Sequence, residues 1–173
     1  MLVLVTGGAA SGKSAHAERL LCDAAPAGER LYLATMQPFG EAAARRIARH
    51  RELRHGKGFV TAERCLGLAG FAPPRRSEGV LLECLPNLLA NEMFSLEGAG
   101  SAAAQAVLDG VFALERRCGT LVAVTNEVFS DGVAYPEETM RYLRALAGIN
   151  RALAAHAGQV YESVCGILCR VKG

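Results

Sequence analysis

The sequence predicts an α/β fold, in which a mostly parallel sheet carries helices on both faces, as a single domain over residues 1–173. Short apolar segments alternate with amphipathic helical segments along the chain. The short segments are apolar nearly throughout, as in strands that are buried on both faces. The length of 173 residues, with 51% hydrophobic and 21% charged residues, suits one folded domain with a full core.

Five segments have the length and composition of buried strands: Leu2–Thr6, Arg30–Ala34, Gly79–Cys84, Leu121–Thr125 and Gln159–Val164. The segments with helical periodicity between them are Ser14–Cys22, Glu41–Arg54, Leu88–Phe94, Ala102–Cys118 and Glu137–His156. Ligands of such sheets bind at the carboxyl ends of the strands. We therefore expect one crevice lined by Thr6–Ser14, Thr35–Gln37, Glu83–Cys84 and Thr125–Glu127.

Charge and hydropathy argue against several classes of function. The formal net charge of +2 is too small to indicate nucleic acid or an anionic membrane as a partner. No stretch approaches the ~20 apolar residues of a transmembrane helix, and the amino terminus lacks the basic residues of a secretory signal. We expect a cytoplasmic protein without membrane insertion, whose six cysteines are reduced, mostly buried and not a metal site.

A phosphate-binding loop follows the first predicted strand. The motif G-x-x-x-x-G-K-[ST] is matched by the run Gly7-Gly8-Ala9-Ala10-Ser11-Gly12-Lys13-Ser14. Small residues let backbone N–H groups close around a di- or triphosphate, and the start of the following helix adds a favourable dipole. In this motif Lys13 reaches the β- and γ-phosphates and Ser14 is a ligand of Mg²⁺. The run therefore predicts a nucleotide site of the P-loop type.

Two other strand ends carry polar residues. Glu83 is the lone carboxylate at the tip of an apolar strand, the Walker B pattern, where it would hold Mg²⁺ or take a proton from an attacking hydroxyl. A carboxylate that only caps a neighbouring helix is the alternative. The stretch Thr125–Glu127 also follows a strand and is placed to contact substrate, although a loop that merely caps helices explains it equally well.

Basic residues gather in the predicted helix Glu41–Arg54. Arg46, His50 and Arg54 share one face at spacings of four, and Arg49 lies beside them. Arginine forks suit a triphosphate, and their charge would keep the His50 imidazole neutral by lowering its pKa. A neutral imidazole can attack phosphorus. A solvated basic face with an ordinary surface histidine is the alternative that the residues leave open.

Further motifs follow one another over nearly the whole chain, namely LVTGGAASGKS with His16-Ala17-Glu18, Tyr32-Leu33-Ala34-Thr35, Arg46-Ile47-Ala48-Arg49-His50, Thr61-Ala62-Glu63, Leu81-Leu82-Glu83-Cys84-Leu85 and Val124-Thr125-Asn126-Glu127-Val128. In this order they resemble the bifunctional adenosylcobinamide kinase/adenosylcobinamide-phosphate guanylyltransferase family of cobalamin biosynthesis. The resemblance implies a RecA-like P-loop fold and a homotrimer. The chain departs from the family pattern at Ala10, where the family usually has arginine, and over residues 129–136, which are bulkier and longer.

The resemblance implies two reactions. The first phosphorylates adenosylcobinamide with GTP or ATP, and the second transfers GMP from GTP to His50 and then to adenosylcobinamide phosphate, giving adenosylcobinamide-GDP. Its implied catalytic residues are His50, Lys13 and Glu83, with Mg²⁺ on Ser14 and Glu83. The implied nucleotide contacts are residues 7–14, Thr35, Arg46, Arg49, Arg54, Glu63 and Glu83. A different small-molecule kinase or NTPase, and a nucleotide-binding protein without turnover, remain as alternatives.

Overall fold

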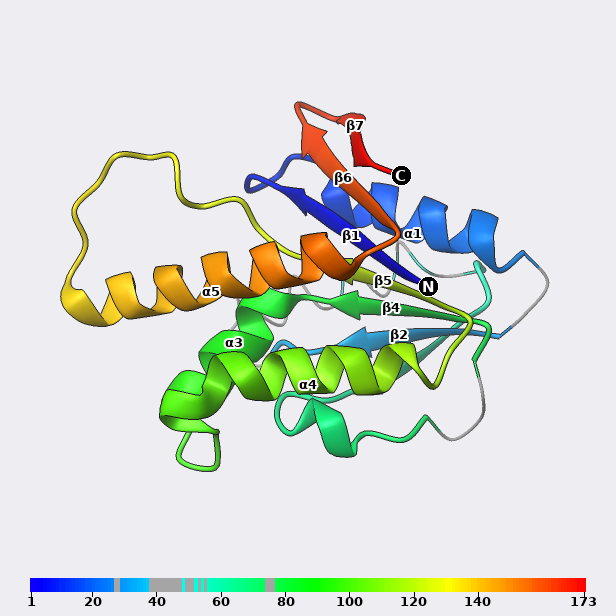
Figure 1. The fold of residues 1–173 in the computed structure, drawn as a ribbon. Coiled ribbons are helices and arrows are strands. Elements are labelled where there is room, and N and C mark those ends of the chain that lie inside the picture. The colour runs from blue at the N-terminus through cyan, green and yellow to red at the C-terminus, as the bar shows by residue number, and fades with distance from the viewer. Residues whose placement is uncertain (27–28, 38–47, 49–51, 53, 55, 74–76) are drawn as a thin grey trace.

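A computed structural model describes residues 1–26, 29–37, 48, 52, 54, 56–73 and 77–173 of the protein. Within these residues a seven-stranded sheet has the order β3-β2-β4-β5-β1-β6-β7 (Figure 1). The first six strands in that order run parallel, and β7 pairs antiparallel with β6. The strands are β1 (Leu2–Gly7), β2 (Arg30–Ala34), β3 (Phe59–Glu63), β4 (Gly79–Glu83), β5 (Thr120–Val124), β6 (Gln159–Val164) and β7 (Ile167–Lys172).

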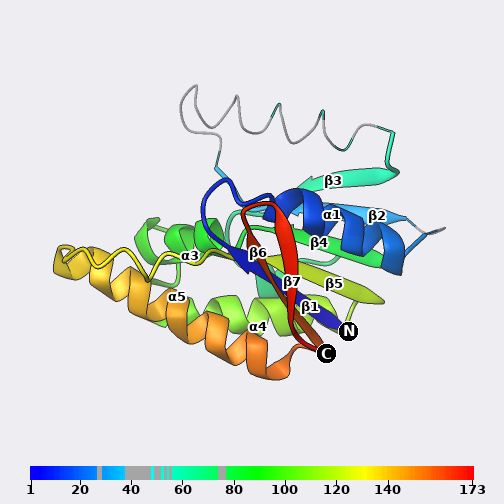
Figure 2. The same ribbon diagram turned by 90° about the horizontal axis from the view of Figure 1, so that it is seen from above.

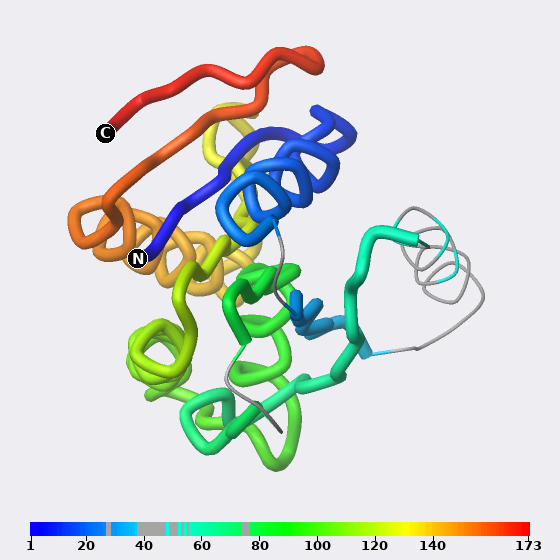
Figure 3. The backbone as a smooth tube through the Cα atoms, turned by 90° about the vertical axis from the view of Figure 1, so that its right-hand side faces the viewer, coloured from blue at the N-terminus to red at the C-terminus, as the bar shows by residue number. Residues whose placement is uncertain are grey.

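Helices cover both faces of the sheet, as the sequence predicts. Figures 2 and 3 show α1 (Lys13–Ala24) on one face and α4 (Ala103–Glu115) with α5 (Glu137–His156) on the other. Helix α3 (Leu85–Phe94) packs against α4 and α5. Successive residues of a strand point to opposite faces, so Val3 and Val5 pack with α1 while Leu2 and Leu4 join the core under α4 and α5.

The five predicted strands are confirmed to within one residue at each end, but two strands were not predicted. Both β3 and β7 lie at edges of the sheet and are largely exposed. Both contain polar or charged residues, Thr61 and Glu63 in β3 and Arg170 and Lys172 in β7, so neither has the continuous apolar sequence of a buried strand. The sheet is therefore wider than the sequence indicates, by one strand at each edge.

The predicted helix Glu137–His156 matches α5 at both ends. Helix α3 begins at Leu85, three residues earlier than predicted, because Pro86 lies in its first turn, where a missing N–H costs no hydrogen bond. The predicted helix Glu41–Arg54 falls largely outside the described residues. Two short 3₁₀ turns, Leu68–Gly70 and Gly100–Ala102, precede β4 and α4 respectively.

The cysteines depart from the prediction in one respect. All six are free, but only Cys118 is buried, and Cys165 and Cys169 are exposed. The expectation that they are mostly buried is therefore wrong, since the last two lie on the exposed hairpin of β6 and β7. None of the helices that the structure describes has the length and apolarity needed to span a bilayer.

Candidate functional site at the carboxyl edge of the sheet

The phosphate loop connects β1 to α1 and lies at the carboxyl edge of the sheet (Figure 1). Three of its residues have positive φ: Gly7 at 151°, Ala10 at 56° and Gly12 at 91°. Gly12 is the residue before α1 and takes the left-handed conformation that glycine accepts without strain. A Cβ at Gly7 would lie 2.6 Å from the carbonyl oxygen of Ser163, so only glycine lets β6 approach the loop this closely.

The lysine of the motif lies against its own loop. Lys13 Nζ donates a hydrogen bond to the Gly8 carbonyl at 2.9 Å, and the Ser11 N–H donates to the same carbonyl at 3.3 Å. Burial lowers the pKa of Lys13, and the nearby side chains of Cys84 and Glu83 act in the opposite direction. A bound polyphosphate would add more negative charge there and favour the protonated amine.

Glu83 and Ser14, which the sequence places 69 positions apart, are in contact. The Ser14 hydroxyl donates a hydrogen bond to Glu83 Oε1. The carboxylate lies at the end of β4 and is only 8% exposed. Hydroxyl and carboxylate oxygens are the hard donors that suit Mg²⁺. The structure therefore brings together the two residues predicted as metal ligands, in a donor set that fits that ion.

Thr35 fastens the end of β2 to the end of β4. Its hydroxyl donates to the Cys84 carbonyl and accepts from the Cys84 N–H, both at 2.8 Å, and its N–H donates to the Glu83 carbonyl at 3.0 Å. Asn91 Nδ2 donates to the Thr35 carbonyl at 2.8 Å. Thr35 is fully buried, and both partners of its hydroxyl are backbone groups of Cys84. Glu63 ends β3 and lies beside Ala34 in register.

The stretch after β5 lies beside the phosphate loop. The Thr125 N–H donates to the Val5 carbonyl at 2.9 Å, and the Glu127 N–H donates to the Gly7 carbonyl at 3.1 Å. Thr125 Oγ1 donates to Asn150 Oδ1 at 2.7 Å, and Asn150 Nδ2 donates to the Asn126 carbonyl at 3.2 Å. Asn150 of α5 therefore fixes this stretch. The four strand ends expected to line one crevice do meet at one edge.

Comparison with known proteins identifies the family. Residues 3–171 match the family described as cobinamide kinase / cobinamide phosphate guanyltransferase. This chain belongs to that family. A relative from Escherichia coli (strain K12), the bifunctional adenosylcobalamin biosynthesis protein CobU, is 37% identical over 99% of this chain and 100% of its own length. The protein of the same name from Salmonella typhimurium is 36% identical over the same shares. Membership makes this chain an enzyme of the transferase class.

More distant solved structures support the fold. The flagellar accessory protein FlaH from Methanocaldococcus jannaschii superposes with a TM-score of 0.52 at 11% identity, covering 99% of this chain and 77% of that one. The KaiC-like protein PH0186 from Pyrococcus horikoshii gives a TM-score of 0.51 at 14% identity, covering 93% of this chain and 71% of that one. At these identities the likeness shows the fold alone. Together with the phosphate loop between β1 and α1, this likeness agrees with the predicted fold.

Arg54 lies among protein neighbours that the sequence did not predict. It is 5% exposed, and its guanidinium lies 3.2 Å from the centroid of the Tyr32 ring, with Nη1 3.8 Å from Glu18 Oε1. Lys57 Nζ is 2.9 Å from the other oxygen of Glu18. The structure therefore gives Arg54 an aromatic and an acidic neighbour that the sequence did not predict, and its contact with a nucleotide phosphate stays a prediction. The spacing predicts that Arg46, His50 and Arg54 share a helix face but not what each one contacts. Arg46, Arg49 and His50 lie outside the described residues.

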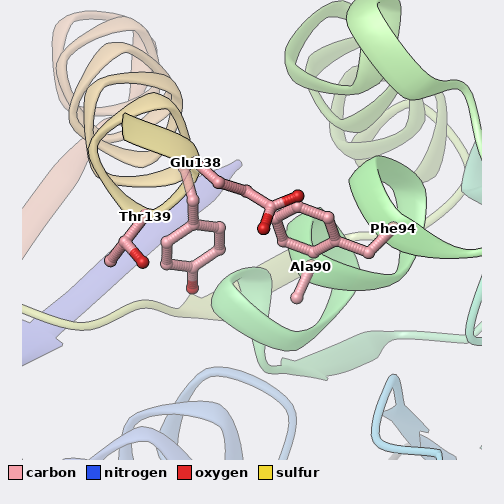
Figure 4. A pocket seen from close by; sticks show the side chains of 5 residues that line it. Ala90, Phe94, Glu138 and Thr139 are labelled. Atoms are coloured by element: carbon pink, nitrogen blue, oxygen red, sulfur yellow. The ribbon is translucent and has the colours of Figure 1, made fainter. Parts of the chain in front are cut away.

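A shallow hollow of about 350 Å³ lies between α3 and α5. Figure 4 shows its lining, with Phe94 and Ala90 on α3 facing Glu138 and Thr139 on α5; Tyr142 completes it. None of these residues belongs to the phosphate loop or was named from the sequence. Its residues have ordinary helical spacing within α3 and α5, so only the packing of the two helices reveals the hollow.

Proposed function

We propose that this protein phosphorylates adenosylcobinamide and then, through a guanylylated His50, transfers GMP from GTP to the resulting phosphate. The product is adenosylcobinamide-GDP, in the assembly of the cobalamin nucleotide loop. The family match over residues 3–171 supports the substrate class. The observation that carries the proposal is the contact of Ser14 with Glu83 beside a complete phosphate loop, because that arrangement is built for a nucleoside triphosphate.

In the kinase step, the terminal hydroxyl oxygen of the corrinoid side chain attacks the γ-phosphorus of GTP or ATP. The bond from that phosphorus to the β-phosphate oxygen breaks, and the nucleoside diphosphate leaves. Lys13 and the N–H groups of residues 8–14 bind the phosphate oxygens and stabilise the charge that develops there. Glu83 accepts the proton of the attacking hydroxyl.

In the guanylyl step, a neutral His50 ring nitrogen attacks the α-phosphorus of GTP. A P–N bond forms, the bond to the β-phosphate oxygen breaks, and pyrophosphate leaves. An oxygen of adenosylcobinamide phosphate then attacks the same phosphorus, and the P–N bond breaks. The covalent intermediate divides one difficult displacement into two easier ones. Arg46 and Arg49 would bind the pyrophosphate oxygens, since arginine forks match phosphate geometry.

The proposal includes Mg²⁺ held by Ser14 Oγ and the Glu83 carboxylate. This ion would offset the negative charge of the bound triphosphate. Thr35 and Glu63 stay in the proposed nucleotide site because they end β2 and β3 at the same edge of the sheet as Glu83. We also propose that the enzyme works in the cytoplasm and forms a homotrimer. Light scattering on the purified protein would test the trimer.

The decisive experiment is covalent labelling with GTP carrying ³²P at the α-phosphate. We expect the wild-type protein to acquire a label that is stable in alkali and lost in acid, as a phosphoramidate is. The His50→Ala variant should acquire none, because no other side chain is proposed to attack the α-phosphorus. His156→Ala is the matched control, since His156 lies against Glu115 and Phe112, away from the phosphate loop.

Three outcomes separate the candidate functions. Equal labelling of His50→Ala and wild type would refute the histidine mechanism. Transfer of the γ-phosphate to a small molecule without any α-label would instead indicate a kinase that lacks the guanylyl step. Nucleotide binding with no turnover on any corrinoid would indicate a binding protein.

A further inference from the structure

The hairpin of β6 and β7 touches the phosphate loop, although 152 positions separate the two in sequence. Ser163 Oγ donates a hydrogen bond to the Ser11 carbonyl at 2.7 Å. The Gly166 N–H donates to the same carbonyl at 3.1 Å. Two donors from one hairpin therefore converge on a single backbone oxygen of the loop. Figure 1 shows the tip of this hairpin beside the loop that follows β1.

Burial and close backbone packing both support the contact between the hairpin and the phosphate loop. Ser163 is 1% exposed, so its hydroxyl is removed from water and its bond to Ser11 replaces a bond to solvent. The absence of a side chain at Gly7 creates the room, because a Cβ there would lie 2.6 Å from the Ser163 carbonyl oxygen. The loop and the hairpin fit each other at backbone distance.

His16 makes a second attachment, from the first turn of α1. Its Nε2 donates to the Gly166 carbonyl at 3.0 Å, and its Nδ1 accepts from Arg19 Nη2 at 3.0 Å. This pattern is that of the neutral ring with its proton on Nε2. The hairpin tip is thus held both by the loop and by the helix that the loop begins.

The two bonds to the Ser11 carbonyl fix the orientation of the next N–H group. The peptide that joins Ser11 to Gly12 is trans, and in a trans peptide the carbonyl and the N–H point in opposite directions. When the carbonyl is drawn toward the hairpin, the Gly12 N–H points away from it. That N–H belongs to the loop that is proposed to bind phosphate, and preset donors need no reorientation when the anion arrives.

We propose that Ser163 is a positioning residue for nucleotide binding, which holds the Ser11–Gly12 peptide so that the Gly12 N–H faces the bound phosphate. The hairpin is then a functional part of the nucleotide site and not only an edge of the sheet. The inference rests on the proposed nucleotide binding of this loop. It assigns to Ser163 an effect on nucleotide affinity that a purely structural serine would lack.

The test is the dissociation constant of GTP with Mg²⁺, measured by calorimetry without corrinoid. Ser163→Ala should raise this constant about three- to tenfold, which corresponds to one lost hydrogen bond. Ser163→Thr keeps the hydroxyl and should restore affinity. Ser77→Ala is the matched control, because Ser77 is also buried but precedes β4, at the opposite edge of the sheet; its GTP affinity should equal that of the wild type.

Thermal unfolding with and without GTP separates positioning from stability. A structural defect lowers both melting temperatures alike, whereas weaker binding reduces the increase that GTP produces. We expect the smaller GTP-induced increase for Ser163→Ala only. His16→Ala, which removes the bond to Gly166 and leaves Ser163 in place, should weaken GTP binding in the same direction.

The outcomes distinguish this inference from the function on which it rests. A wild-type protein that does not bind GTP would refute the proposed function. A wild-type protein that binds GTP while Ser163→Ala binds it equally well would overturn the positioning role alone. If Ser163→Ala does not fold, His16→Ala decides, and unchanged affinity in that variant overturns the role.

Discussion

The phosphate loop and the loop of residues 128–136 lie at the same edge of the sheet, yet they are held in different ways. The phosphate-loop region is bonded to distant parts of the chain, through Glu83 to Ser14 and through Ser163 to Ser11. Within the described residues, the side-chain hydrogen bonds of residues 129–135 reach no more than four positions along the chain. Bonds to distant parts of the chain hold the phosphate loop, whereas bonds between residues close in sequence hold the loop of residues 128–136.

The difference indicates which part of the site can vary. A phosphate group has the same shape in every nucleotide, and a loop that many contacts fix can present its N–H groups without reorganisation. The other loop exposes Phe129, Val133 and Tyr135 to solvent, each by more than a third. The sequence departs from the family pattern over residues 129–136 of this loop, and in the phosphate loop at Ala10. Sequence change is tolerated where few distant contacts depend on it.

The largest effect should come from Lys13→Ala. We expect the rate of γ-phosphoryl transfer to fall about 10²- to 10³-fold, because one charged donor to the transferring phosphate is lost. The assay follows γ-labelled GTP and ATP with adenosylcobinamide as acceptor. Lys172→Ala is the control, since Lys172 Nζ bonds only carbonyls near the end of α5 in the described chain. A Lys13→Ala rate close to that of the wild type would mean that the phosphate loop is not the kinase site.

A smaller effect is expected at the junction between the two regions, in Asn150→Ala. This change removes the acceptor of Thr125 Oγ1 and the donor to the Asn126 carbonyl. Thr125 is fully buried, so the loss should lower the free energy of unfolding by about 1–3 kcal/mol. Denaturant unfolding measures this loss.

The same variant tests how separate the two regions are. GTP affinity should change little, because the bonds of the phosphate loop to Glu83 and Ser163 do not involve Asn150. The rate of corrinoid turnover should fall by a larger factor than the affinity for GTP, because the substitution loosens the stretch after β5. Equal losses in both measurements would show that the two regions act as one unit.

The fold was largely predictable because buried strands and long amphipathic helices leave periodic patterns. The Ser14–Glu83 contact was also predictable, since the motif fixes one residue at a helix start and the other ends a strand at the same edge. The exposed edge strands β3 and β7 were not, because edge strands keep polar side chains on their open faces.

Ser163 and Arg54 show why the rest of the site could not be predicted. The partner of Ser163 is a backbone carbonyl, which every residue has, so no sequence pattern identifies it. Arg54 has the spacing of an anion-binding face, but its guanidinium lies over the Tyr32 ring and 3.8 Å from Glu18. Spacing along a helix tells which side chains share a face, whereas packing decides what that face meets.

The smallest effect should come from Tyr135→Phe, within residues 128–136. The Tyr135 hydroxyl donates to Asp131 Oδ2 at 2.5 Å and is the main cause that lowers the pKa of Asp131 from its usual 3.8, with help from the Val133 N–H. A lowered pKa in the folded state adds stability above pH 3.8, and this is lost as pH falls through the lowered value. Phenylalanine should move the pKa of Asp131 upward, which a carboxyl-carbon NMR titration would detect. Both side chains are solvated, so stability at neutral pH and GTP affinity should stay at wild-type values. A change in GTP affinity would mean that this loop is linked to the phosphate loop and that the two regions are not held independently.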